Sequence, residues 1–189
     1  MLKVKHIIKH FRNIIVHKYW VYFFGRLMGI PRWTLLKHDL SKFSPVEFWE
    51  SVRYYQGNKS PIPICKEING YSKAWQHHKG RNPHHYEYWT DNYDSGTTLI
   101  PMPFEYLEEM LADWFAAGRT YQGKEYSFAS QISWWKNKRE QNPAIHPITR
   151  DMIDDFYDDL EGFPLEFWKM HRNKIKQEYQ RNLENHGFC

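Results

Sequence analysis

Cysteine is scarce in this chain of 189 residues, which holds only Cys65 and Cys189. Two cysteines exclude a disulfide-stapled scaffold and a four-cysteine zinc site. Such sparse use of cysteine is typical of a reducing compartment, so the sequence predicts a cytoplasmic protein.

The chain also lacks a long apolar run. Near the N-terminus the longest uncharged stretch extends from Tyr19 to Gly25, between Lys18 and Arg26, whereas a membrane-spanning helix needs ~20 apolar residues. No small-residue cleavage site accompanies this stretch, so we expect no signal peptide. The sequence therefore argues against a membrane-spanning protein.

Strand-like alternation is nearly absent, and the spacing of apolar residues indicates helices. The first predicted helix covers residues 3–28, where one face at three- and four-residue steps carries Val4, Ile8, Phe11, Ile15 and Tyr22. This is the pattern of an amphipathic helix.

Eight further helices are predicted along the chain. A second helix follows Pro31 and ends near residue 42, and a third follows the capping box at Ser44 and reaches residue 55. The others cover residues 66–79, 82–89, 103–117, 127–139, 149–160 and 164–183, with loops at 57–63 and 91–101. We expect an all-α, single-domain helical bundle, with residues 1–120 as the core and the helices of 121–189 packed on it.

Histidine and aromatic residues are abundant, and charge is unevenly spread. The chain has 11 histidines and 9 tryptophans, which point to an imidazole-rich site in a bulky aromatic core. Residues 1–42 hold nine Lys/Arg and one acid, whereas residues 101–162 hold six basic and twelve acidic residues. The basic segment could attract an anionic substrate, or these charges could be solvated helix faces.

The most informative local feature is the dyad His38-Asp39, followed by Lys42. An imidazole nitrogen and a carboxylate oxygen suit Fe, Mn, Zn or a related divalent ion. A lysine three residues later can bind a phosphate oxygen as a point charge.

Other candidate ligands lie on separate predicted helices. His17 is on the first helix, off its apolar stripe, and Asp113 is on the 103–117 helix. The doublets His77-His78 and His84-His85 flank a short loop. From the first doublet we prefer His78 as the ligand, and from the second His85. His84 is then a substrate-binding group or a rival ligand. We expect Glu109 to be solvated, with support of a metal ligand as the alternative, and the remaining histidines, His6, His10, His146, His171 and His186, to lie at the surface.

The order His17, His38-Asp39, a histidine from each doublet and Asp113 resembles the HD superfamily of metal-dependent phosphohydrolases. His38-Asp39-Leu40-Ser41-Lys42 looks like the HD-x-G-K motif of that superfamily, with serine in place of glycine. This resemblance covers roughly residues 10–120. Two longer segments, His38 to Phe43 and Asn82-Pro83-His84-His85-Tyr86-Glu87-Tyr88-Trp89, resemble a family of bacterial and phage proteins of unknown function.

The resemblance implies an HD-domain-like fold and a hydrolytic site with one or two divalent ions (Fe, Mn, Zn, Ni, Co or Mg). His17, His38, Asp39 and Asp113 would hold one ion, and His78 and His85 a second, with Asp39 bridging. Lys42 and Asp39 would be catalytic, and Lys37, Arg81 and His84 would help to bind a nucleotide or another phosphate ester.

Two alternatives remain open. Some members of the superfamily are di-iron oxygenases, and six candidate ligands permit that chemistry. Alternatively, the basic amphipathic helix at residues 3–28 could bind an anionic membrane, nucleic acid or a protein partner without catalysis.

Overall fold

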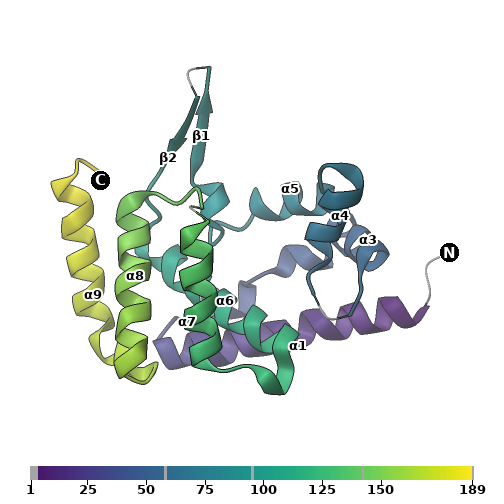
Figure 1. Ribbon diagram of the computed structural model, residues 1–189, viewed down its shortest axis with the longest axis horizontal. Helices are drawn as coiled ribbons and strands as arrows, with labels where there is room; N and C mark the ends of the chain where they lie inside the picture. Colours follow the sequence, from purple (N-terminus) through teal and green to yellow (C-terminus); the bar gives the residue numbers. More distant parts are fainter. Residues whose placement is uncertain (1–3, 58, 95, 142, 189) are drawn as a thin grey trace.

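A computed structural model describes residues 4–57, 59–94, 96–141 and 143–188. In chain order the elements are α1 (Val4–Met28), α2 (Arg32–Lys37), the 3-10 helix η1 (Leu40–Phe43), α3 (Pro45–Tyr54), α4 (Pro61–Asn69), α5 (Lys73–Lys79), η2 (Tyr86–Tyr88), β1 (Thr90–Tyr93), β2 (Gly96–Leu99), α6 (Phe104–Gln122), η3 (Gly123–Glu125), α7 (Phe128–Glu140), α8 (Pro147–Gly162) and α9 (Glu166–Asn185). The all-α prediction is confirmed (Figure 1). Residue 3, where the first helix was predicted to begin, and Cys189 lie outside the described residues.

Helices α1 and α6 pack against each other at the centre of the fold. Helix α6 is buried almost all round and supplies Leu107, Met110, Leu111 and Phe115 to the core. Helices α7, α8 and α9 stand side by side beyond it (Figure 1). A helix that is buried on most of its surface can present side chains both to the core and to a site on its other face.

The amphipathic pattern of α1 does not identify the face that packs. Val4, Ile8, Phe11 and Ile15 are exposed, whereas the buried face carries two histidines together with Ile14, Val21, Phe24 and Met28. The packing face therefore combines core residues in its second half with polar groups in its first half. The apolar stripe remains on the outside of the molecule.

Glycine allows α2 to approach α1 closely. A Cβ atom built on Gly25 would lie 2.3 Å from Cδ2 of Leu35, and both residues are buried. Because α2 leads directly into His38 and Asp39, this close approach helps to fix their position.

The region between residues 57 and 80 differs from the prediction. Helix α4 begins at Pro61, after the N-cap Ser60, inside the segment predicted as a loop. The predicted 66–79 helix is divided, because Gly70 ends α4 with a φ of 78° and Ser72 caps α5. Glycine is the usual residue for such a left-handed helix end.

Other predicted elements and boundaries also differ from the structure. The predicted helix at 82–89 is a turn followed by η2, and the predicted loop at 91–101 contains the antiparallel β1–β2 hairpin, which projects from the helices (Figure 1). Helix α6 continues past Gly118 to Gln122. A Cβ at Gly118 would lie 2.6 Å from Oε1 of Gln131, so this glycine permits close packing instead of ending the helix.

No helix within the described part of the chain is long and apolar enough to cross a membrane.

Candidate metal centre

The dyad His38-Asp39 occupies a sharp turn between α2 and η1. Asp39 adopts the left-handed conformation, with φ 56° and ψ 25°, and is the only non-glycine residue with positive φ among the described residues. Aspartate tolerates this conformation better than most residues, and such backbone strain is concentrated at functional sites. Lys18 supports the turn by donating its ammonium protons to the backbone carbonyls of Leu36 and His38.

One group of side chains surrounds Oδ2 of Asp39. Nε2 of His38 lies 3.1 Å from this oxygen, and Nε2 of His17 lies 3.5 Å from it. Oδ1 of Asp113 lies 2.9 Å from Nε2 of His17 and 3.4 Å from Nε2 of His38. Four buried residues from α1, the dyad turn and α6 thus bring their ligand atoms to one point.

A second group faces the other oxygen of the same carboxylate. Oδ1 of Asp39 lies 3.3 Å from Nε2 of His78 and 3.4 Å from Nε2 of His84. His85 completes this group, in which all ligand atoms lie within 4.8 Å of one another. The two oxygens of Asp39 therefore face two different sets of imidazoles.

The donor atoms fit divalent metal ions. Several of them are buried and lack a hydrogen bond of good geometry, although they lie close together: Nε2 of His17, His38, His84 and His85, Oδ1 of Asp39, and Oδ1 of Asp113. Buried polar atoms are rarely left unpaired, because each lost hydrogen bond is costly. Imidazole nitrogens and carboxylate oxygens converging in this way suit Fe, Mn, Zn and related ions.

Glu109 orients two of the imidazoles. Nδ1 of His38 donates to Oε1 of Glu109 at 2.8 Å, and Nδ1 of His84 lies 3.3 Å from the same oxygen. A proton on Nδ1 leaves Nε2 free to act as a ligand, which is the usual arrangement of a metal-binding histidine with its supporting carboxylate.

Glu47 has the same role on the other side. Nδ1 of His78 donates to Oε2 of Glu47 at 2.7 Å, and Nδ1 of His77 donates to Oε1 at 2.6 Å. Nδ1 of His78 also lies 3.1 Å from the hydroxyl of Ser41, which accepts a hydrogen bond from Asn82. This network links α3, α5 and η1 around one ligand.

The charges of the cluster are strongly coupled. Burial alone would raise the pKa of Asp39, but His38, Lys42 and His78 hold it well below the usual value. Burial lowers the pKa of His85 far below its usual value, helped by neighbouring His84 and His78, so its imidazole is neutral. Nζ of Lys42 lies 2.5 Å from Oδ2 of Asp39.

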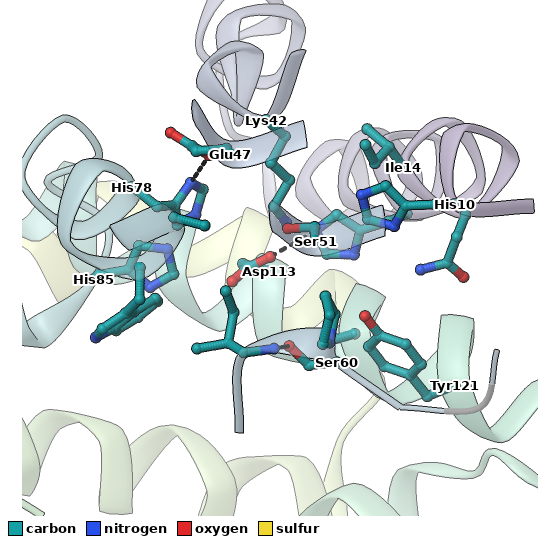
Figure 2. Close-up of a pocket in the computed structure, with 17 residues that line it drawn as sticks. His10, Ile14, Lys42, Glu47, Ser51, Ser60, His78, His85, Asp113 and Tyr121 are labelled. Atoms are coloured by element: carbon teal, nitrogen blue, oxygen red, sulfur yellow. Dashed lines mark hydrogen bonds and ion pairs between the residues drawn. The ribbon is translucent and has the colours of Figure 1, made fainter. Parts of the chain in front are cut away.

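A cavity of about 180 Å³ adjoins the cluster. In Figure 2, His78 and His85 lie on one side, His10 and Tyr121 on the other, and Asp113 and Lys42 between them. The remaining wall residues include Ile14, Ser51, Ser60, Pro61, Ile62, Ala74, Trp75 and Ala117. Apolar atoms make up most of the wall, which also carries hydroxyl and imidazole groups, the carboxylates of Glu47 and Asp113, and one cationic side chain, that of Lys42.

Comparison with known proteins gives a family but no activity. A family described as a family of unknown function, DUF5662, matches residues 6–159. The chain belongs to this family. No curated protein and no solved structure matches the chain. The region matched to DUF5662 includes every residue of the cluster, whereas α9 lies beyond it.

In this DUF5662 chain all six predicted ligands come together: His17, His38, Asp39, His78, His85 and Asp113. The choice between His84 and His85 was left open by the sequence. The geometry favours His84 as the ligand, because Glu109 supports its ring and its Nε2 faces Asp39. His85 lines the cavity.

Two predicted substrate-binding residues lie elsewhere. Lys37 and Arg81 are exposed and do not line the cavity. Neither can therefore contact a molecule held there in this structure.

The prediction for two other residues is wrong. Glu109 is buried against His38, although we expected it to be solvated, and His10 is buried against the rings of Phe48 and Tyr55, although we expected it at the surface. Glu109 lies one helical turn before Asp113, and His10 two turns before His17, so both could have been placed on the site face by helical periodicity.

Proposed function

We propose that this protein is a metal-dependent phosphohydrolase whose site holds two divalent ions. The observation that carries this proposal is the position of Asp39. One of its oxygens faces His17 and His38, and the other faces His78 and His84. A carboxylate with separate imidazole sets on its two oxygens is suited to bridge two cations.

The order of the ligands along the chain adds support, because it resembles that of the HD superfamily. In this proposal His17, His38 and Asp113 would hold one ion with Asp39, and His78 and His84 would hold the other. Divalent ions bound in this way would supply a nucleophile at neutral pH and stabilise the negative charge that develops on a phosphoryl group.

Other residues around the cluster bind the substrate, orient the ligand imidazoles and exclude water. Lys42 reaches from η1 into the same cavity and provides the cation that binds a phosphate oxygen. Glu47 and Glu109 keep protons on the Nδ1 atoms of the ligands that they contact, so that Nε2 remains available. Ile14, Ile62 and Trp75 supply an apolar wall that limits access of water to the reacting group.

The size of the cavity favours a small phosphate ester over a nucleotide. Sites for drug-sized molecules occupy roughly 300–1,000 Å³, and an apolar cavity of roughly 150 Å³ holds benzene. The cavity here, about 180 Å³, is nearer the second value. Its single cation suits one phosphate group better than a polyphosphate chain.

The test combines metal content with activity. Purified protein would be analysed for transition metals and assayed on a panel of small phosphomonoesters and nucleoside monophosphates. His38→Ala and Asp39→Ala should lose both metal and activity, whereas His186→Ala, which removes an exposed histidine, should keep both. Equal metal retention by all three variants would refute the proposed site.

A di-iron oxygenase is the second candidate, favoured by the excess of imidazole over carboxylate among the cluster ligands. Imidazole-rich sites with few carboxylates suit iron as well as zinc. Dioxygen consumption separates the two functions, because phosphate release proceeds unchanged without oxygen. Turnover that requires iron and stops under anaerobic conditions would favour the oxygenase.

A further inference from the structure

Within residues 4–49 the exposed side chains form a surface that is both apolar and cationic. On α1 the side chains of Val4, Ile8, Phe11 and Ile15 lie along one exposed stripe. The ring of Phe43 in η1 lies 5.9 Å from that of Phe11, so the stripe extends onto the adjoining segment. We call this stripe and its extension the α1 surface; its members are Val4, Ile8, Phe11, Ile15, Tyr19, Leu36, Leu40 and Phe43.

Cations flank the α1 surface without exposed acids among them. Lys5, Lys9 and Arg12 are exposed on α1 beside the stripe. Within residues 4–49 the only acids are Asp39 and Glu47, and both are buried in the metal-binding cluster. The site therefore removes the negative charge of this segment from its surface and leaves the positive charge outside.

We propose that the α1 surface binds an anionic lipid bilayer. A helix with an apolar stripe bordered by lysine and arginine lies in the membrane interface, where apolar side chains enter the acyl boundary and cations meet anionic headgroups. The aliphatic side chains Val4, Ile8 and Ile15 suit acyl chains better than nucleic-acid bases. A second copy of the same surface would bring like charges together.

Trp33 and Trp49 extend the same argument. Both indoles are exposed, and both lie within residues 4–49. Tryptophan is enriched at membrane interfaces, because its ring is apolar and its N–H group stays hydrated. Their fluorescence would report contact with lipid.

Vesicle flotation provides the test. The full-length protein would be mixed with vesicles of phosphatidylcholine alone, or of phosphatidylcholine with phosphatidylglycerol. We expect flotation with the anionic vesicles only, weakened by added salt. Lys9→Glu should weaken binding at least about fivefold. Ile8→Asp should weaken it about tenfold or more.

A matched substitution distinguishes binding through the α1 surface from non-specific binding to vesicles. Ile68 on α4 is 66% exposed and Ile8 is 62% exposed, so Ile68→Asp makes the same chemical change at similar exposure outside the α1 surface. Ile68→Asp should float like the unmodified protein, and both variants should retain the metal content of the unmodified protein. This last measurement keeps the result independent of the hydrolase proposal.

Three outcomes would overturn the proposal. One is the absence of flotation with anionic vesicles, and another is an equal loss in Ile8→Asp and Ile68→Asp. The third is binding to DNA or self-association, abolished by Ile8→Asp, in a protein that does not bind vesicles.

Discussion

Nδ1 of His78 donates a hydrogen bond of 2.7 Å to Glu47, and both side chains are buried. Glu47 does not face Asp39 in this arrangement; it acts through the imidazole. Carboxylates in this position fix the ring orientation and increase its basicity. The pair allows the supporting role of Glu47 to be measured separately from ligation.

We predict that Glu47→Gln lowers metal affinity about 10–100-fold while the protein remains folded. The amide keeps the size of the carboxylate but removes the charge that faces His78 and His77. Competition with a chromogenic chelator would give the affinity, and circular dichroism would report the fold. Glu67→Gln, at an exposed position on α4, is the control and should bind metal normally. Unchanged affinity in Glu47→Gln would mean that His78 is not a ligand.

The contact between Gly25 and Leu35 gives a prediction about stability. Gly25→Ala places a methyl group where Leu35 lies, and overpacking of this kind costs roughly 1–3 kcal/mol. Gly162→Ala is a matched control, since a Cβ there meets no atom within 4 Å and its φ is not in the left-handed range. We expect thermal unfolding to show a lower Tm for Gly25→Ala and an equal or higher Tm for Gly162→Ala. Equal Tm values would show that Leu35 moves aside without cost.

Much of the helical order could be predicted from the sequence because spacing, caps and breakers are local signals. The capping residue Ser44 and the N1 proline Pro45 mark the start of α3, as predicted. The hairpin between β1 and β2 carries mostly exposed polar residues, so it has no apolar alternation to reveal it. The sequence predicts a helix end at Gly118, because it does not show that Gln131 and Tyr126 pack against this glycine.

The candidate metal ligands could be predicted from the sequence, but the residues that support them could be predicted less well. A dyad such as His38-Asp39 is visible because its residues are adjacent, whereas Glu109 becomes part of the site only through its contact with His38. The apolar stripe of α1 does not identify the packing face of the helix, for a related reason. The polar residues His10 and His17 are buried because they face the cavity and the cluster, and periodicity of apolar residues cannot reveal that.

Metal binding should respond to pH in a defined direction. In the metal-free protein, burial opposes protonation of His38, but Asp39, Asp113 and Glu109 raise its pKa well above the usual value. A raised histidine pKa contributes stability that is fully present below the unfolded pKa of ~6.5 and is lost as the pH rises through the folded value. A metal ion competes with that proton, because a ligating imidazole must be neutral.

The stabilisation by metal should therefore grow with pH. At a free metal concentration of about 100 times Kd the gain is about 2.7 kcal/mol, which corresponds to a rise in Tm of roughly 5–10 °C. We expect a larger rise near pH 8 than near pH 6, because protons compete less at the higher pH. Thermal unfolding with metal and with chelator, at pH 6 and at pH 8, would measure this rise in Tm. A metal-induced rise in Tm that is the same at pH 6 and pH 8 would contradict binding by these imidazoles. So would a rise in Asp39→Ala as large as that in the unmodified protein.

Lys42 separates substrate binding from metal binding. Its Nζ lies beside Asp39, and the Asp39 carboxylate raises the pKa of Lys42 above its usual value despite burial, so the side chain is cationic at neutral pH. Lys42→Met keeps the apolar stem and removes the charge. A hydrogen bond to a charged group contributes about 1.5–3 kcal/mol, so kcat/KM for a phosphate ester should fall about 10–150-fold. Because Lys42 supplies no ligand atom to the cluster, the metal content should not fall.

Lys37→Met is the control for this change, because Lys37 is exposed and lies outside the cavity. It removes a lysine from the same basic segment, so a general electrostatic effect would lower kcat/KM in both variants. A phosphate-binding role for Lys42 requires that KM and the inhibition constant of inorganic phosphate rise only in Lys42→Met, with partial recovery in Lys42→Arg. If Lys42→Met instead loses metal as fully as Asp39→Ala does, the ammonium group serves to hold Asp39 in place and the anion must be bound by other groups.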